Sequence, residues 1–340
     1  MYYAPIYIPT LCRYEHLKRG LASLKKNSWA RYTDVYIALD YPAKESHWGG
    51  YRKICEYLEN EDFSIFSRFV VVKREKNYGA GMNSFVMCNE IMRKYDRWIF
   101  AEDDIVFAPN FLEYMDKCLE HFENDDEILA INGYTYPIDW KLEKDSTVFK
   151  QSATFSTWGA GFWKKKYLAV RQELGSGYLR ENFDRAVHDG TLSKMIKGRC
   201  CDYVIFALSG EREGLYYKMS DVALSIYLKL KRMVVISPAI TKTRNYGFDG
   251  SGAYCSKIEK ITNNNSVEYD YTYQPIDEEE GIEVVVDSGL NYQVNEQALS
   301  DFLYVDSLTK RKVQLLMVAY RILGLERCGN IYQKLKTLFK

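Results

Sequence analysis

The 340-residue sequence predicts an α/β fold in which a mostly parallel sheet is flanked by helices and followed by a C-terminal helical appendage. The first observation is that short apolar runs alternate with segments whose apolar positions recur at helical spacing. The second is the run Trp98 to Ala101, which suits a strand buried on both faces and ends in Glu102-Asp103-Asp104. Ligands of such sheets bind at the carboxyl ends of strands, so these three acids mark the predicted site.

Each predicted element follows from its local pattern. Predicted strands cover residues 5–9, 34–40, 69–72, 98–101, 128–133 and 233–238. Helical periodicity falls at residues 17–24, 51–58, 85–92, 111–122 and 222–228. Asn110 is predicted to cap the fourth of these helices, with Glu113 completing a capping box. Residues 171–213 mix polar and apolar positions and are expected to form one or two helices.

Composition narrows the functional class. The 46 basic residues balance the 46 acidic ones, so the chain lacks the basic footprint expected of a nucleic-acid-binding protein. The eight cysteines show no Cys-x-x-Cys spacing, which argues against a zinc site and for reduced thiols. Without a signal peptide or an apolar run that spans a bilayer, the expected location is cytoplasmic. The basic, leucine-rich segment 307–340 leaves peripheral membrane contact or a homodimer as alternatives.

The three adjacent acids carry the chemical prediction. Glu102, Asp103 and Asp104 repel one another, so their ionised forms favour a divalent cation that joins them to an anionic ligand. Ligands that are all oxygen favour Mg²⁺ or Mn²⁺. The alternative is a solvated acidic turn before the next helix.

Glu102-Asp103-Asp104 followed by Ile-Val-Phe-Ala-Pro-Asn-Phe resembles the acidic motif of glycosyltransferases with the A-type nucleotide-sugar fold. The family is represented by eukaryotic N-acetylglucosaminyltransferases that start complex N-glycan branching and by bacterial family-two-like enzymes. The resemblance implies that Asp104 is the direct ligand of Mn²⁺ or Mg²⁺. It covers residues 1–256, the expected catalytic domain, and leaves 257–340 as a partly helical appendage.

The resemblance also assigns nucleotide contacts in the first half of the chain. It implies that Arg13, just after the first strand, contacts the pyrophosphate or the uridine, and that Asp40 reads uracil. A carboxylate can accept the imide N–H of uracil, so the chemistry fits. The resemblance places Asn77 and Gly79 in a segment that closes over the nucleotide. The alternatives are a solvated arginine in the first helical turn and a turn aspartate.

The second half of the chain holds the remaining predicted site residues. By resemblance, the segment with Trp158 and Gly159 lines the donor-sugar pocket, and its alternative is a buried helix start. Lys242 and Arg244 lie in a glycine-containing loop that would order over a diphosphate and offset its charge, and the alternative is a simple exposed hairpin. Asp221 matches the family's catalytic base in the order of elements, although a simple helix cap is its alternative.

The predicted function is therefore a metal-dependent inverting glycosyltransferase. It would move a sugar from a UDP-sugar to a hydroxyl group of a saccharide or lipid-linked saccharide, in bacterial surface-glycan synthesis. A sugar-1-phosphate nucleotidyltransferase is one alternative, but it would carry a glycine-rich basic loop where this chain has Pro9-Thr10-Leu11-Cys12-Arg13. A non-catalytic carbohydrate-binding protein is the other, and it predicts no metal-dependent affinity for nucleotides.

Overall fold

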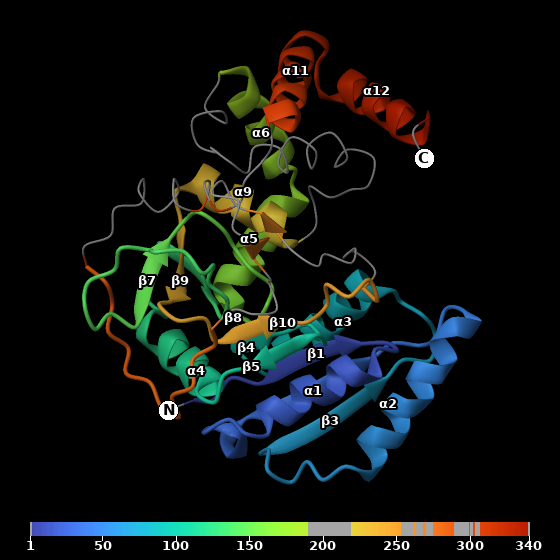
Figure 1. The fold of residues 1–340 in the computed structure, drawn as a ribbon, viewed down its shortest axis with the longest axis vertical. Helices are drawn as coiled ribbons and strands as arrows, with labels where there is room; N and C mark the ends of the chain where they lie inside the picture. Colours follow the sequence, from blue (N-terminus) through green and yellow to red (C-terminus); the bar gives the residue numbers. More distant parts are fainter. Residues whose placement is uncertain are drawn as a thin grey trace.

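The computed structural model describes residues 2–189, 219–252, 261–262, 268–269, 275–288 and 307–338, with single positions at 299 and 302. These residues form an eight-stranded sheet in the order β3-β2-β1-β4-β8-β6-β9-β7, with helices on both faces (Figure 1). Its strands are β1 Ile6–Thr10, β2 Asp34–Leu39, β3 Arg68–Lys73, β4 Arg97–Phe100, β6 Ile128–Asn132, β7 Val148–Gln151, β8 Ala160–Trp163 and β9 Val234–Pro238. The prediction of a mostly parallel α/β sheet is confirmed.

The first half of the sheet is parallel, because β1 pairs with β2 and β4, and β2 pairs with β3, all in the same direction. Its helices are α1 Tyr14–Leu24, α2 Trp48–Asn60 and α3 Ala80–Met92, with short 3-10 turns at Ala30–Tyr32 and Glu45–His47. Side chains alternate across β1: Ile6 and Ile8 join the core beneath α1 and α2, and Tyr7 joins the core beneath α3. Both faces are therefore buried, which explains the continuous apolar runs.

The second half of the sheet mixes directions. Strand β8 runs antiparallel between β4 and β6, β9 runs parallel to β6, and β7 runs antiparallel along the edge. The segment 160–163 is thus a strand rather than the helix start that was its alternative. Gly161 allows α4 to approach, since a Cβ atom there would lie 3.3 Å from the side chain of Leu119.

A two-stranded ribbon lies beside the sheet at the predicted site. It pairs β5, Ile105–Phe107, antiparallel with β10, Thr243–Asn245. Helix α1 packs directly on β5: a Cβ atom at Gly20 would lie only 2.7 Å from the main-chain oxygen of Ile105. The ribbon joins the acidic turn, which precedes β5, to the glycine-containing loop, which follows β10.

Helix α4, Phe111–His121, begins where the sequence predicts, but its cap differs. The side chain of Asn110 does not cap it and instead donates 3.0 Å hydrogen bonds to Asp277 and to the main-chain oxygen of Gly281. Asn27 fills the vacant role, because its Oδ1 accepts a 2.9 Å hydrogen bond from the main-chain nitrogen of Leu112. The predicted capping box is therefore wrong, since a residue distant in sequence supplies the acceptor.

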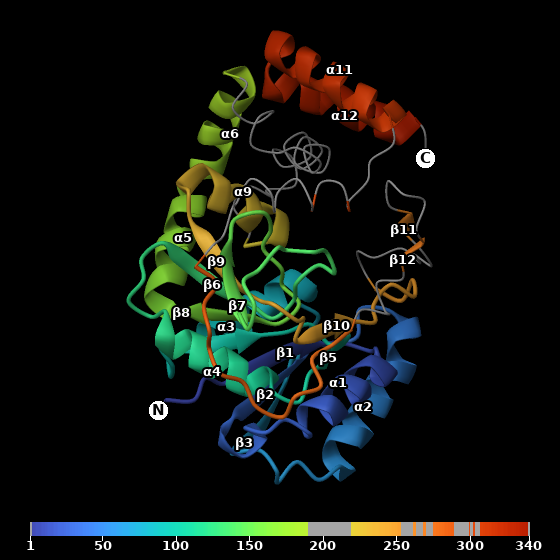
Figure 2. The ribbon, with the colours of Figure 1, turned by 60° about the vertical axis from the view of Figure 1, so that its left-hand side comes forward.

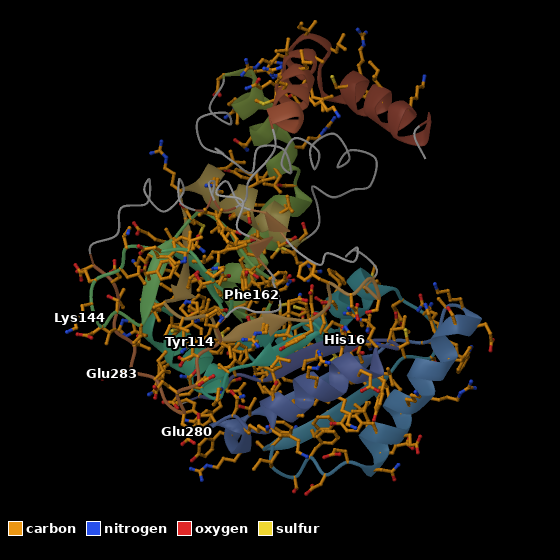
Figure 3. The ribbon with its side chains drawn as sticks, viewed as in Figure 1. His16, Tyr114, Lys144, Phe162, Glu280 and Glu283 are labelled. Atoms are coloured by element: carbon orange, nitrogen blue, oxygen red, sulfur yellow. The ribbon has the colours of Figure 1, made fainter. Side chains whose placement is uncertain are left out.

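Residues 275–288 form an extended strap over the outside of the sheet domain. The strap bridges β7 through Val148 and Val286. It passes α4, where Glu280 and Glu283 lie on the outer side of the molecule (Figure 3). Residues that the sequence places in the appendage thus pack against the predicted catalytic domain.

The remaining described elements lie outside the eight-stranded sheet and the two-stranded ribbon. They are α5 Lys164–Gly175, α6 Tyr178–His188, α9 Asp221–Lys231, α11 Ser307–Leu323, α12 Leu325–Leu338 and a small pair of strands, β11 Ile261–Thr262 and β12 Glu268–Tyr269. The two helices expected within residues 171–213 correspond to the end of α5 and to α6, and residues 190–213 lie outside the described residues. Figure 2 shows α11 and α12 at the end of the molecule remote from β3. Among the described helices, none is long and apolar enough to cross a bilayer.

Candidate active site

The predicted acidic residues lie in the turn between β4 and β5. Glu102 follows β4, and Asp103 and Asp104 lead into β5 at Ile105. Asp103 is 6% exposed and Asp104 is 5% exposed. Two buried, adjacent carboxylates require a countercharge, because an unpaired buried charge is strongly unfavourable.

Arg13 supplies this countercharge from the start of α1. One guanidinium nitrogen contacts Asp103 Oδ1, and Nη1 lies 2.8 Å from Asp104 Oδ2. Thr10 Oγ1 donates a 2.8 Å hydrogen bond to Asp103 Oδ2. Burial alone would lower the pKa of Arg13, but the two carboxylates outweigh burial and raise this pKa above its ordinary value. The guanidinium therefore stays charged and bridges both aspartates.

One oxygen of Asp104 has no hydrogen-bond partner among the described residues. This atom, Oδ1, is buried, whereas Oδ2 faces Arg13. Burial raises the pKa of the Asp104 carboxyl, and the charge of Arg13 opposes that rise. Leaving a buried carboxylate oxygen unpaired is costly, so this oxygen is open to a hydrogen-bond donor or a cation.

Gly247 approaches the same carboxylate from the loop after β10. A Cβ atom at this position would lie 2.0 Å from Asp104 Oδ2, closer than any side chain tolerates. The approach is fixed by two hydrogen bonds: Tyr246 N donates to the main-chain oxygen of Asp104 at 2.9 Å, and Gly247 N donates to Asn245 Oδ1 at 2.6 Å. Glycine is thus required for this loop to close on Asp104.

Glu102 is the most strongly shifted carboxyl of the turn. Burial, together with the negative charges of Asp104, Asp221 and Asp103, raises the pKa of Glu102 to about 8. Thr157 Oγ1 donates a 3.4 Å hydrogen bond to Glu102 Oε1. The effect of Asp221 on this pKa places the predicted base within electrostatic range of the acidic turn.

Asp221 itself is the first residue of α9 and is exposed. The cap of α9 is Ser220, whose hydroxyl accepts a 3.2 Å hydrogen bond from Ala223 N. Asp221 Oδ1 accepts a 2.8 Å hydrogen bond from Val222 N, the neighbouring residue. Because Ser220 does the capping, the carboxylate of Asp221 is available at the helix start.

The loop 246–250 is tied to both sides of the site. The ring of Phe248 packs edge-on against Trp158, with centroids 5.7 Å apart. Asp249 Oδ2 lies 3.2 Å from Nε2 of His16, which sits on α1 (Figure 3). The pair Phe248-Asp249 had no predicted role, and the structure shows that it connects the loop to α1 and to the segment before β8.

Trp158 and Gly159 directly precede β8, and Trp158 contacts the 246–250 loop through Phe248. Gly159 has a φ of 78°, and a Cβ atom there would lie 2.9 Å from both Phe111 and Thr243. The ring of Trp158 packs edge-on against Tyr134, with centroids 4.6 Å apart. The positive φ and the tight packing together require glycine at position 159. Trp158 lies near Glu102, because the neighbouring residue Thr157 donates the hydrogen bond to Glu102 described above.

Asp40 lies at the end of β2 and organises the segment that carries Asn77 and Gly79. Its Oδ2 accepts hydrogen bonds from Gly79 N at 2.8 Å and from Asn77 Nδ2 at 3.3 Å. Its Oδ1 accepts hydrogen bonds from Tyr78 N at 2.9 Å and Tyr41 N at 3.0 Å. The structure thus brings these three predicted nucleotide contacts together, and both carboxylate oxygens already hold the segment in place.

The two predicted cations of the loop go to different places. Lys242 is 2% exposed, and its ammonium group pairs with Asp277 of the strap. Burial lowers the pKa of Lys242, and the pairing with Asp277 opposes that change. Arg244 lies on β10, where Nη1 donates a 3.2 Å hydrogen bond to the hydroxyl of Tyr246. The structure does not bring Lys242 to the acidic turn.

The chemistry of this turn fits one kind of cation site. Within the described residues, no group of three or more His, Cys, Asp or Glu side chains is arranged to hold a metal ion. The unpartnered oxygen of Asp104 supplies one hard ligand. Mg²⁺ is commonly bound through one or two carboxylates together with substrate phosphates and water. The residues therefore fit a cation that arrives with a phosphate ligand, and they do not form a protein-only cage.

Four residues of the site were missed by the sequence analysis. Thr10, His16, Thr157 and Gly247 each contact a predicted residue or the loop that covers it. A helical signal existed for His16 alone, since it stands three positions after Arg13 and shares its side of α1. The contacts of Thr10, Thr157 and Gly247 join segments that are far apart in sequence, so no local sequence pattern predicts them.

Neither a protein-family model nor a curated protein matches this chain. Three solved structures are similar at low identity. The mannosyltransferase PcManGT from Pyrobaculum calidifontis, in complex with GDP-Man and Mn²⁺, shares 13% identity at a TM-score of 0.32, covering 48% of this chain and 44% of its own. S. aureus TarS 1-349 in complex with UDP shares 12% identity at a TM-score of 0.38, covering 70% and 58%. The bifunctional glycosyltransferase WbbM shares 13% identity at a TM-score of 0.28, covering 51% and 34%.

The chain spans roughly a third to three fifths of the length of these structures. At such TM-scores the likeness transfers neither a substrate nor a metal to this chain.

Proposed function

We propose that this chain is a glycosyltransferase that moves a sugar from a nucleoside-diphosphate sugar, with a UDP-sugar as the expected donor, to a hydroxyl acceptor. One observation carries the proposal. In the acidic turn, Arg13 bridges Asp103 and Asp104 while a buried oxygen of Asp104 has no partner among the described residues. The positive charge of Arg13 suits a diphosphate, and the unpartnered carboxylate oxygen of Asp104 suits a divalent cation that binds together with it.

Asp104 is the residue that would hold Mn²⁺ or Mg²⁺ in this proposal. When bound, the cation supplies Lewis-acid stabilisation of the leaving diphosphate. Arg13 lies beside the same carboxylate and would add a second positive charge. Gly247 supports this arrangement, because the absence of a side chain allows its loop to pack against the carboxylate of Asp104.

Asp221 is the proposed base. In an inverting transfer, the acceptor oxygen forms a bond to C1 of the sugar as the bond from C1 to the diphosphate oxygen breaks. The electron pair of the broken bond leaves with the diphosphate, and the proton of the acceptor hydroxyl passes to a carboxylate. Asp221 is exposed at the start of α9 and so is accessible to an acceptor, and its charge contributes to the raised pKa of Glu102.

The remaining assignments follow the chain along the donor. We assign the nucleotide to the segment that Asp40 holds, with contacts from Asn77 and Gly79, and the donor sugar to the segment at Trp158. Support comes from the hydrogen bonds that order the first segment and from the packing that fixes Trp158 beside the 246–250 loop. The resemblance to bacterial enzymes favours surface-glycan synthesis, with a saccharide or lipid-linked saccharide as acceptor.

The nucleotidyltransferase alternative loses support from the placement of Arg13. Such an enzyme needs a flexible glycine-rich basic loop after β1. Here Arg13, three residues after the end of that strand, pairs with two carboxylates. The non-catalytic alternative predicts that nucleotides do not bind.

Calorimetric titration of UDP and other nucleoside diphosphates, with Mn²⁺ and with a chelator, tests the proposal. We expect Mn²⁺-dependent, uridine-selective binding that Asp104→Asn abolishes. Asp116→Asn is the matched control, because Asp116 is another buried carboxylate with an unpartnered oxygen but lies on α4. Absence of binding to every nucleotide would favour the non-catalytic alternative, and equal loss in both variants would remove Asp104 as the cation ligand.

A further inference from the structure

The two C-terminal helices form a distinct surface at one end of the molecule. Helix α11 packs on α6 and α12, and Figures 1 and 2 both show this group remote from β3. Its inner side is firmly held: Met317 is 8% exposed, Tyr320 is 1% exposed, and the Tyr320 hydroxyl donates a 3.0 Å hydrogen bond to Asp184 of α6. Helix α11 therefore has a fixed inner face and a defined outer face.

The outer face of α11 is apolar. Leu315 is 70% exposed, Val318 is 51% exposed and Ile322 is 76% exposed. Their spacing of three and four places them in one row along the helix, on the side opposite Met317 and Tyr320. Leu315 and Ile322 are the two most exposed large hydrophobic side chains among the described residues. A row of three solvent-exposed aliphatic side chains is typical of an interaction surface.

The charged residues of the two C-terminal helices are mostly basic. Between Ser307 and Leu338 the sequence contains seven lysine or arginine residues and one glutamate, whereas the whole chain has a net charge of zero. Arg311 stands four residues before Leu315 in the same row, and Lys312 is its exposed neighbour. A basic helix with an exposed apolar stripe is the pattern of an interfacial membrane helix.

We propose that the outer face of α11, with the basic residues around it, docks this protein on an anionic membrane surface. The aliphatic row would enter the headgroup boundary while the basic residues meet anionic lipids. A second copy of the chain fits less well. It would present the same basic row to its partner, and like charges facing each other in a symmetric contact are unfavourable.

This inference stands apart from the proposed glycosyl transfer, because vesicle binding requires neither a nucleotide nor a cation. If both proposals hold, the docked enzyme would meet an acceptor that is anchored in the same membrane. If nucleotide binding fails while vesicle binding persists, only the enzymatic proposal falls.

The test is flotation of the full chain with vesicles of phosphatidylcholine alone or of phosphatidylcholine mixed with phosphatidylglycerol. We expect binding to the anionic vesicles and its loss at high salt. Arg311→Gln/Lys312→Gln should weaken binding about 25-fold, since each basic residue near an anionic surface contributes about fivefold. Leu315→Gln/Ile322→Gln should weaken it by about 100-fold, since these side chains lose most of their apolar transfer.

The matched control is Ile65→Gln/Ile240→Gln, which removes two exposed aliphatic side chains elsewhere, 45% and 53% exposed. It should bind vesicles as the parent chain does. The proposal is overturned if neither vesicle binds, or if the control weakens binding as much as Leu315→Gln/Ile322→Gln. It is also overturned if sedimentation reveals a dimer that Leu315→Gln/Ile322→Gln dissociates without any vesicle binding, because the face would then serve self-association.

Discussion

Replacing Gly247 with alanine tests the closest contact in the site. The new Cβ atom would lie 2.0 Å from Asp104 Oδ2, 2.8 Å from Asp104 Cγ and 3.1 Å from Asn245 Oδ1. The backbone at Gly247 does not have the positive φ that disfavours alanine. Any effect of Gly247→Ala therefore comes from this collision rather than from backbone strain.

The collision sets the size of the effect. Separating the Cβ atom from Oδ2 to an ordinary contact requires a movement of at least about 1 Å. Asp104 cannot rotate freely, because Oδ2 lies 2.8 Å from Arg13 Nη1, so the rotation would break that ion pair. Overpacking of this kind costs about 1–3 kcal/mol of unfolding free energy. Misplacing a catalytic group by about 1 Å can cost about 100-fold in rate.

Two measurements and one control variant check this prediction. Denaturant unfolding should show Gly247→Ala to be less stable than the parent chain, and titration with UDP and Mn²⁺ should show weaker binding. Gly175→Ala is the control, since Gly175 ends α5 and a Cβ atom there meets nothing within 4 Å. That variant should be as stable as the parent or up to about 1 kcal/mol more stable.

The unfolding measurement tests the structure independently of any enzymatic role. If Gly247→Ala unfolds at the same denaturant concentration as Gly175→Ala, then Gly247 does not lie against Asp104 and the described loop is incorrect. If stability falls but Mn²⁺-dependent binding is unchanged, the contact is real and the assignment of Asp104 as cation ligand is refuted.

Three further variants probe other parts of the molecule. Asp116 is buried, which raises its pKa to about 7, so the folded state keeps a proton that the unfolded state loses above about pH 4. Stability should therefore fall as pH rises from about 4 to 7, and Asp116→Asn should remove this loss, gaining on the order of 2 kcal/mol at pH 8 by thermal or denaturant unfolding. A parallel pH dependence in both proteins would contradict it. Lys242→Met should cost about 3–5 kcal/mol because Asp277 stays buried without its cation, and Lys242→Met/Asp277→Leu should recover most of this loss; an unrecovered double variant would argue against the pair. Asp221→Asn should keep nucleotide binding and lower transfer at least about 100-fold, and full turnover would exclude it as the base.

Much of the scaffold was predictable because its signals are local. The strands at Ile6–Thr10 and Asp34–Leu39 and the helix at Phe111–His121 follow from apolar runs and helical spacing, which act within a few residues. The acidic turn was predictable for the same reason: it follows directly on the apolar strand Arg97–Phe100. Chain order then places such a turn at the ligand edge of a parallel sheet.

The partners of the charged groups were not predictable, because pairing depends on segments that only the fold brings together. Lys242 is basic and precedes a glycine-containing loop, but its charge neutralises Asp277 of the strap and not a group of the acidic turn. The predicted cap of α4 was wrong for the same reason. Asn27, which is distant in sequence, accepts the hydrogen bond from Leu112 N, and the side chain of Asn110 binds the strap.

Sequence alone therefore determined which groups this protein carries and where they fall in an α/β fold: three carboxylates at a strand end and a carboxylate, Asp221, at a later helix start. The tertiary structure decided how those groups are arranged. It set Arg13 between Asp103 and Asp104, left one oxygen of Asp104 unpartnered among the described residues, and brought Gly247 against it. The physical reason is that the apolar patterns that define strands and helices are local in sequence. Charge pairing and close packing instead depend on which distant segments the fold brings together.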